Sequence, residues 1–137
     1  MAEEKLSILI TDDDKFLSDM YSIKFSEHGF TVQMATSAKA CLDILAKDFK
    51  PDIFLVDIIM QEMDGFQLIE ELKKKGLAGD STIIVLSNLG QHEDIEKGLA
   101  VGADGYIIKA NATPTEVVSK VEEIVANKKS NKSINNV

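Results

Sequence analysis

Residues 51–65 read PDIFLVDIIMQEMDG, and the interpretation of the whole chain starts from this stretch. Four apolar residues, Ile53 to Val56, run without a break and end at Asp57. An uninterrupted apolar run of this length is typical of a strand buried on both faces, as in a parallel sheet. A carboxylate at the carboxyl end of such a strand lies where open parallel sheets place their ligands and their chemistry. One Asp after a strand is a weak signal, because it often only caps the next turn, so the assignment depends on the other strands.

Short apolar runs alternate with helical patterns along the rest of the chain. Strands are predicted at residues 6–11, 31–35, 51–57, 82–87 and 106–109, and each is followed by a predicted helix. The fourth helix, from Gln91 to about Val101, is the weakest, and Ile95 and Leu99 are expected to face inward. Five such βα units predict a parallel sheet covered by helices on both faces. The expected fold class is therefore α/β, a three-layer αβα sandwich.

Composition and charge narrow the class of protein. The 137 residues are 45% hydrophobic and fit one domain, expected at residues 1–127 with a polar tail or linker at 128–137. The net charge of −8 argues against general binding to nucleic acid or to anionic membranes. The single cysteine, Cys41, excludes an intrachain disulfide, and a buried apolar role is expected for it. The polar start, MAEEK, is no signal peptide and no apolar run is long enough to span a membrane, so a cytoplasmic protein is expected.

The residues that end the strands carry the functional signal. Asp12 and Asp13 follow the first strand, Asp57 the third, Ser87 ends the fourth and Lys109 ends the fifth. The carboxyl ends of parallel strands open onto one edge of the sheet, so these side chains can converge. Three carboxylates repel one another unless a cation neutralises them, and oxygen ligands of this kind suit Mg²⁺. A lysine and a hydroxyl nearby could bind the oxygens of a phosphoryl group. The pattern indicates a Mg²⁺-dependent phosphoryl site with an Asp as a possible nucleophile.

The segments TDDD, LVDIIM, MDG, VLS and GADGYIIK, taken together and at these spacings, closely resemble the receiver domain of bacterial response regulators in two-component signalling. The resemblance, to chemotaxis-regulator-like receivers, extends over about residues 6–127. It implies a flavodoxin-like five-stranded sheet in the order 2-1-3-4-5.

The resemblance implies a role for each residue at the strand ends. Asp57 would be the phosphoacceptor, attacking a phosphohistidine on a sensor histidine kinase or a phosphotransfer protein. Mg²⁺ would be held by Asp12, Asp13, Asp57 and the backbone carbonyl of Ile59. Lys109 would pair with the phosphoryl oxygens.

A switch is implied as well. Ser87 would donate its hydroxyl to the phosphoryl group, and Tyr106 would swing inward behind it. This would reshape the surface of the fourth helix, fifth strand and fifth helix for a downstream protein target or a homodimer partner. Asn88 stands beside the phosphoryl pocket, where its amide could crowd the group or hydrogen-bond to it.

The chain departs from the family pattern at several positions. Ala110 follows Lys109 where the family has a proline after a cis bond. A cis bond before a residue other than proline costs about 2.5–4 kcal/mol, so either that strain is retained or the loop is rebuilt. Ile59 and Leu89 occupy the two positions that flank the hydrolytic water in the family. Both are apolar and cannot orient a water, which predicts slow self-dephosphorylation.

Other functions fit the residues less well. A phosphohydrolase of the haloacid dehalogenase type would need a second Asp two residues after the nucleophile, where this chain has Ile59. A flavodoxin relative would need a hydroxyl- and glycine-rich phosphate loop after the first strand, where three aspartates stand. A pseudo-receiver that is not phosphorylated is disfavoured because all five site positions are filled. Whether the domain acts alone or belongs to a longer protein stays open.

Overall fold

The apolar runs of the sequence form five strands in the computed structural model, which describes residues 5–135 and the side chains of residues 5–130. The strands are β1 (Ser7–Thr11), β2 (Thr31–Ala35), β3 (Ile53–Val56), β4 (Thr82–Ser87) and β5 (Gly105–Ile108). They pair in parallel in the order β2-β1-β3-β4-β5. The predicted α/β class and the sheet order are both confirmed.

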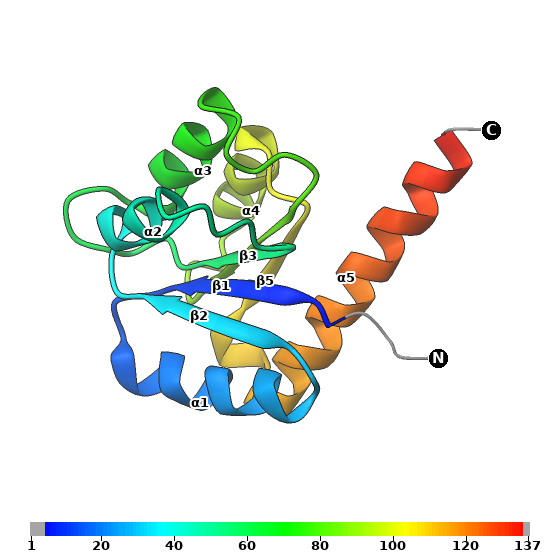
Figure 1. The fold of residues 1–137 in the computed structure, drawn as a ribbon, viewed down its shortest axis with the longest axis horizontal. Coiled ribbons are helices and arrows are strands. Elements are labelled where there is room, and N and C mark those ends of the chain that lie inside the picture. Colours follow the sequence, from blue (N-terminus) through cyan, green and yellow to red (C-terminus); the bar gives the residue numbers. More distant parts are fainter. Residues whose placement is uncertain (1–4, 136–137) are drawn as a thin grey trace.

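Helices cover both faces of this sheet (Figure 1). One layer contains α1 (Lys15–Glu27) and α5 (Pro114–Asn135), and the other contains α2 (Ala38–Leu45), α3 (Gly65–Lys74) and α4 (His92–Val101). Side chains of β3 alternate between the two cores: Phe54 packs on the α2–α3 side and Leu55 on the α1–α5 side. Because the strand is buried on both faces, it needs the unbroken apolar run seen in the sequence.

Polar caps fix where the helices begin. The Asp14 carboxylate accepts the Leu17 N–H at the start of α1, and the Ser37 hydroxyl accepts the Ala40 N–H at the start of α2. Thr113 and Glu116 each accept the other's backbone N–H at the start of α5. These bonds satisfy N–H groups that have no partner within the helix. They also set the lengths of the loops that carry the strand-end residues.

The fifth helix is longer than the sequence predicts. An irregular tail was expected from Lys128, but α5 continues to Asn135 and projects past the body of the domain (Figure 1). Lys128 Nζ donates to the Ser81 carbonyl at 2.8 Å and to Asp104 Oδ2 at 3.1 Å. These contacts hold the helix against the domain beyond Val125, the last buried apolar residue of α5 among the side chains described. The division into a domain of residues 1–127 and a linker stays a prediction, and residues 1–4 and 136–137 lie outside the described residues.

The packing face of α4 also differs from the prediction. Leu99, expected inward, is 50% exposed, while Ile95 is half-buried. The buried residue of this helix is Gly98. Because Gly98 has no side chain, the helix backbone itself approaches the sheet there, and this turns Leu99 outward.

No helix among residues 5–135 is both long enough and apolar enough to cross a membrane.

Candidate functional site

The acidic residues that follow β1 and β3 come together at one edge of the sheet. Thr11 and Val56 are partners in the β1–β3 register, so the next residues, Asp12 and Asp57, lie side by side. The Asp57 N–H donates to the Thr11 carbonyl at 2.9 Å, which fixes the chain at this point. Asp12 and Asp57 are 2% and 7% exposed, whereas Asp13 faces solvent. Each of the three can place a carboxylate oxygen within 4.8 Å of the others.

Lys109 reaches this cluster from the far side of β4. Its Nζ lies 2.7 Å from Asp12 Oδ2 and 3.0 Å from Asp57 Oδ2, and its side chain is 8% exposed. Residues Lys109–Asn111 form a short 3₁₀ turn, and no peptide bond within the described chain is cis. Of the two alternatives left open by Ala110, the structure therefore has the rebuilt loop. The lysine still contacts both carboxylates.

The charges of Asp12, Asp57 and Lys109 act strongly on one another because little water reaches these three side chains. Burial raises the pKa of Asp12, and the Asp57 charge adds to this, although Lys109 and the Asp14 N–H oppose it. Burial would lower the pKa of Lys109, but its hydrogen bond to Asp12 and the Asp57 charge outweigh that effect and raise it. Lys109 is therefore a cation at neutral pH. One ammonium faces three acidic side chains, so the cluster favours a further cation.

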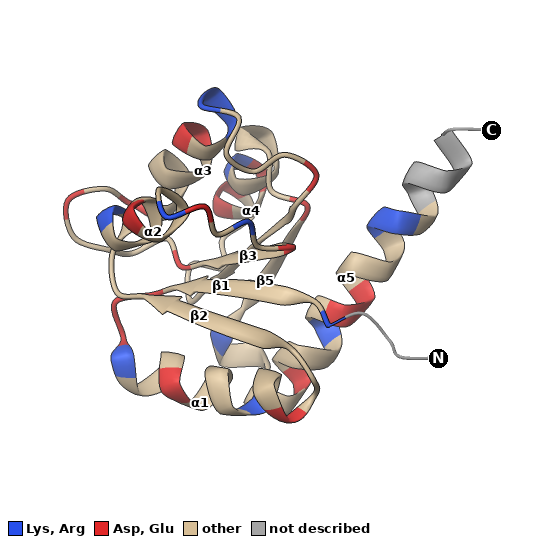
Figure 2. Ribbon diagram, in the orientation of Figure 1, with Lys and Arg blue, Asp and Glu red and all other residues tan. Residues whose placement is uncertain are grey.

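The donor set fits Mg²⁺. This ion prefers carboxylate oxygens and keeps several waters, and it is commonly bound through only one or two carboxylates. Asp12 and Asp57 offer buried oxygens, and Asp13 offers one at the solvent-facing side. Figure 2 shows the acidic residues in the loops that follow β1 and β3. The Ile59 carbonyl as a further ligand stays a prediction.

Ser87 and Tyr106 are connected through the backbone of Leu89. Ser87 is fully buried at the end of β4, and its Oγ accepts the Leu89 N–H at 3.2 Å. The Tyr106 hydroxyl donates to the Leu89 carbonyl. Burial raises the pKa of Tyr106 to about 12. Asn88, between these residues, is exposed. Ser87 and Tyr106 are thus both bonded to one residue of the β4–α4 loop.

Gly65, the first residue of α3, lies directly against the backbone of Asp57. A Cβ at Gly65 would lie 2.2 Å from the Asp57 carbonyl oxygen. Its N–H donates to the Ile58 carbonyl at 2.9 Å. Only a residue without a side chain allows α3 to start this close to the site. An Asp-Gly pair is a common turn signal in a sequence, but such a pair does not indicate that two distant backbone segments approach each other.

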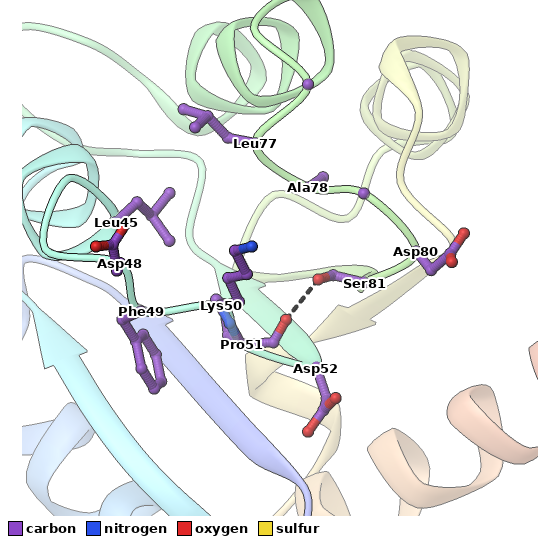
Figure 3. A pocket seen from close by; sticks show the side chains of 12 residues that line it. Leu45, Asp48, Phe49, Lys50, Pro51, Asp52, Leu77, Ala78, Asp80 and Ser81 are labelled. Carbon is purple, nitrogen blue, oxygen red and sulfur yellow. Dashed lines mark hydrogen bonds between the residues drawn. The ribbon is translucent and has the colours of Figure 1, made fainter.

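The residues around the site differ in exposure, and a cavity opens on one side of it. Ile59 is 61% exposed and Leu89 is half-buried. A cavity of about 800 Å³ opens beside Asp13, between the start of α2 and the loop after β3. A separate cavity of about 480 Å³ lies at the opposite end of the strands, next to the amino ends of β3 and β4 (Figure 3). The Ser81 hydroxyl donates to the Pro51 carbonyl in its wall. This second cavity contains none of the predicted site residues.

Comparison with known proteins shows the family to which the chain is similar. Residues 8–122 match the family described as the response regulator receiver domain. The chain is 31% identical over 122 residues to the response regulator SaeR of Staphylococcus aureus, covering 89% of this chain and 51% of SaeR. It is 34% identical over 102 residues to RpaA of Synechocystis, named a DNA-binding dual master transcriptional regulator, covering 74% of this chain and 42% of RpaA. The chain thus spans about half the length of the curated relatives it matches.

Solved structures give the same result. A CheY-like receiver domain protein from Methanospirillum hungatei superposes with a TM-score of 0.81 at 26% identity, covering 93% of this chain and 99% of that one. The receiver domain of a Francisella response regulator superposes with a TM-score of 0.79 at 28% identity, covering 90% and 98%.

Proposed function

The chain belongs to the family of response regulator receiver domains, and on that premise we propose that it accepts a phosphoryl group on Asp57. The donor would be a phosphohistidine on a sensor histidine kinase or a phosphotransfer protein. The observation that carries the proposal is the buried Asp57 carboxylate, which lies 3.0 Å from Lys109 Nζ and beside two further aspartates. The open cavity beside Asp13 leaves room for a donor to approach.

The phosphoryl group passes directly from the donor histidine to Asp57, and the reaction needs no third reactant. A carboxylate oxygen of Asp57 forms a bond to phosphorus while the phosphorus–nitrogen bond of the donor breaks, and the electron pair goes to the imidazole nitrogen. Lys109 is already within 3.0 Å of Asp57 and would pair with the transferred oxygens. Asp12, Asp13 and Asp57 would hold Mg²⁺, and bound Mg²⁺ would offset the negative charge of the carboxylates and of the phosphoryl group.

Ser87 and Tyr106 would transmit the change to the surface. A hydroxyl that accepts one hydrogen bond can still donate its own proton, so Ser87 can bond to a phosphoryl oxygen. Movement of Ser87 would shift Tyr106, because both side chains form hydrogen bonds with the backbone of Leu89. The reshaped surface of α4, β5 and α5 would then bind a downstream protein or a second copy of the chain.

We propose a signalling switch and not an enzyme with turnover: the chain would catalyse only its own phosphorylation and a slow dephosphorylation. A cytoplasmic location, and the expectation that this chain does not itself bind nucleic acid, stay predictions.

Intact mass spectrometry tests the proposal after incubation with acetyl phosphate and Mg²⁺. The parent should gain the mass of one phosphoryl group, while Asp57→Asn, and the parent in EDTA, should gain none. Asp14→Asn is the matched control and should gain one phosphoryl group like the parent, because Asp14 follows Asp12 and Asp13 in the sequence but caps α1, a role that asparagine also fills. A parent that stays unmodified, or a modified Asp57→Asn variant, would contradict the proposal.

A further inference from the structure

Helix α4 approaches the sheet most closely at a residue with no side chain. A Cβ at Gly98 would lie 3.0 Å from Cδ2 and 3.2 Å from Cε2 of the Tyr106 ring. Carbon atoms in ordinary contact lie about 3.5–4.0 Å apart, so the ring occupies the space that a side chain at position 98 would need. The Tyr106 ring therefore rests on the backbone of the helix.

The backbone conformation does not explain the glycine. Gly98 lies within a regular helix, unlike Gly102 at the helix end, where φ is +117°. Glycine is less favourable than alanine in the interior of a helix because it loses more conformational freedom on folding. What the glycine provides is room for the ring.

The same ring is held at its other end by its hydroxyl, which donates to the Leu89 carbonyl. The Leu89 N–H in turn donates to Ser87 Oγ at 3.2 Å. A continuous set of contacts therefore runs from Ser87 through Leu89 and Tyr106 to Gly98. When the ring is displaced, the hydroxyl moves furthest, because it lies at the far end of the side chain. Hydrogen bonds depend steeply on geometry, so the bond from this hydroxyl to the Leu89 carbonyl is the contact that a small displacement weakens most.

We propose that Gly98 is a positioning residue for Tyr106: the absence of a side chain at position 98 admits the ring between α4 and the β4–α4 loop and so links Ser87 to the surface of α4. The importance of this link for signalling rests on the proposed function, but the placement of the ring does not. One methyl group at position 98 displaces the ring by a few tenths of an ångström and weakens the hydrogen bond of its hydroxyl, which favours a solvent-facing orientation of this half-exposed tyrosine.

The test uses fluorine NMR on protein labelled with 3-fluorotyrosine. The chain has two tyrosines, so Tyr21→Phe and Tyr106→Phe assign the two signals. Gly98→Ala should move the Tyr106 signal toward that of the free amino acid and increase its shift between H₂O and D₂O at least twofold. The Tyr21 signal, from a ring buried in the other core, should stay in place.

Alanine also strengthens a helix, and a matched variant separates that effect from the loss of space. Ala100 is exposed on the same helix, so Ala100→Gly lowers helix propensity without adding an atom near Tyr106. The double variant Gly98→Ala with Ala100→Gly keeps the composition of α4 and should match Gly98→Ala in its Tyr106 signal. Ala100→Gly alone should match the parent. An unchanged Tyr106 signal in Gly98→Ala, or a change of equal size in Ala100→Gly, would overturn the proposal.

Treatment with acetyl phosphate and Mg²⁺ then tests the link to Ser87. Intact mass, measured on the same samples, shows whether each protein is phosphorylated. In phosphorylated parent the Tyr106 signal should move, whereas in phosphorylated Gly98→Ala it should move by less than half as much. Equal movement in both would overturn the link. If neither protein gains a phosphoryl group, the proposed function fails, while the placement of the ring is still decided by the unphosphorylated spectra.

Discussion

Replacing Lys109 with methionine removes the ammonium that contacts both Asp12 and Asp57 and keeps most of the apolar stem. We expect the free energy of unfolding to fall by about 3–4 kcal/mol at pH 7 in EDTA, at the lower end of the roughly 3–5 kcal/mol typical for removing one partner of a buried ion pair. The lysine side chain is 8% exposed and Asp12 2%, so solvent does not replace the lost charge.

The size of the loss follows from the geometry. Nζ lies 2.7 Å from Asp12 and 3.0 Å from Asp57, so each attraction is about 6 kcal/mol at an effective dielectric constant of about 20, before the loss of hydration is subtracted. Protonation sets an upper limit, because the variant can neutralise one carboxyl instead of leaving two charges together. From the ordinary pKa of 3.8, this costs about 4 kcal/mol at pH 7, at about 1.4 kcal/mol per pH unit.

Protonation of one carboxyl also determines how the stability of the Lys109→Met variant changes with pH. Without Lys109, burial and the neighbouring Asp57 carboxylate raise the pKa of Asp12 in the folded chain above its value in the unfolded chain. The folded state then binds protons more readily than the unfolded state, so lowering the pH favours folding of the variant. The limit falls to about 2 kcal/mol at pH 5, so the difference between variant and parent should shrink between pH 7 and pH 5.

Urea unfolding followed by circular dichroism at the two pH values measures this. Lys15→Met is the control: its ion pair with Asp19 is exposed, so its loss should change stability by less than about 0.5 kcal/mol. Saturating Mg²⁺ should stabilise Lys109→Met more than the parent, because no ammonium competes for Asp57 Oδ2. A deficit below 1 kcal/mol at pH 7, or one that grows toward pH 5, would refute the reasoning.

Three further predictions follow from the site and the core. Gly65→Ala should destabilise the fold by about 1–3 kcal/mol and slow phosphorylation, since its methyl would overlap the Asp57 carbonyl; urea unfolding and intact-mass time courses measure both, and unchanged values would contradict the role of Gly65. Replacing Ile59 with asparagine and Leu89 with glutamate in one double variant should speed dephosphorylation about tenfold, which is the equivalent of one hydrogen bond to the attacking water. Equal rates for this variant and the parent in phosphate-release assays would show that the apolar side chains do not slow dephosphorylation. Burial raises the pKa of Cys41 from 9.0 to about 11, so at pH 8 the fraction of Cys41 present as thiolate should be at least about a hundredfold lower in the native protein than in urea. The rate of its reaction with a disulfide reagent should be lower by the same factor, and rapid labelling of the native protein would disprove this.

The sheet and the acidic cluster were predictable because both depend on local patterns. The apolar run that ends at Asp57 is typical of a buried strand, and the carboxyl ends of parallel strands lie on the same side of the sheet. Asp12 and Lys109 could therefore be placed near Asp57 without knowing a single distance. The resemblance to receiver domains supplied the strand order and the roles.

What the sequence did not predict depends on contacts between distant segments. Leu99 fits a helical apolar pattern, but the packing of α4 is decided by Gly98, which contributes nothing to such a pattern. The continuation of α5 depends on Lys128, whose partners at Ser81 and Asp104 are far away in sequence. The loop after Lys109 could not be chosen either, because Ala110 allows two conformations and only the assembled site selects one.

The unbroken α5 helix has a consequence for anything attached to its end. Lys128 anchors the helix to the carbonyl of Ser81, so its rotation about its own axis is set by the domain. A reporter fused in continuous helix would turn by about 100° and advance about 1.5 Å with each residue inserted. Its orientation would then vary periodically with linker length and recur after about 18 residues, or five turns, so that helical phase, more than distance, governs how the receiver presents an attached domain.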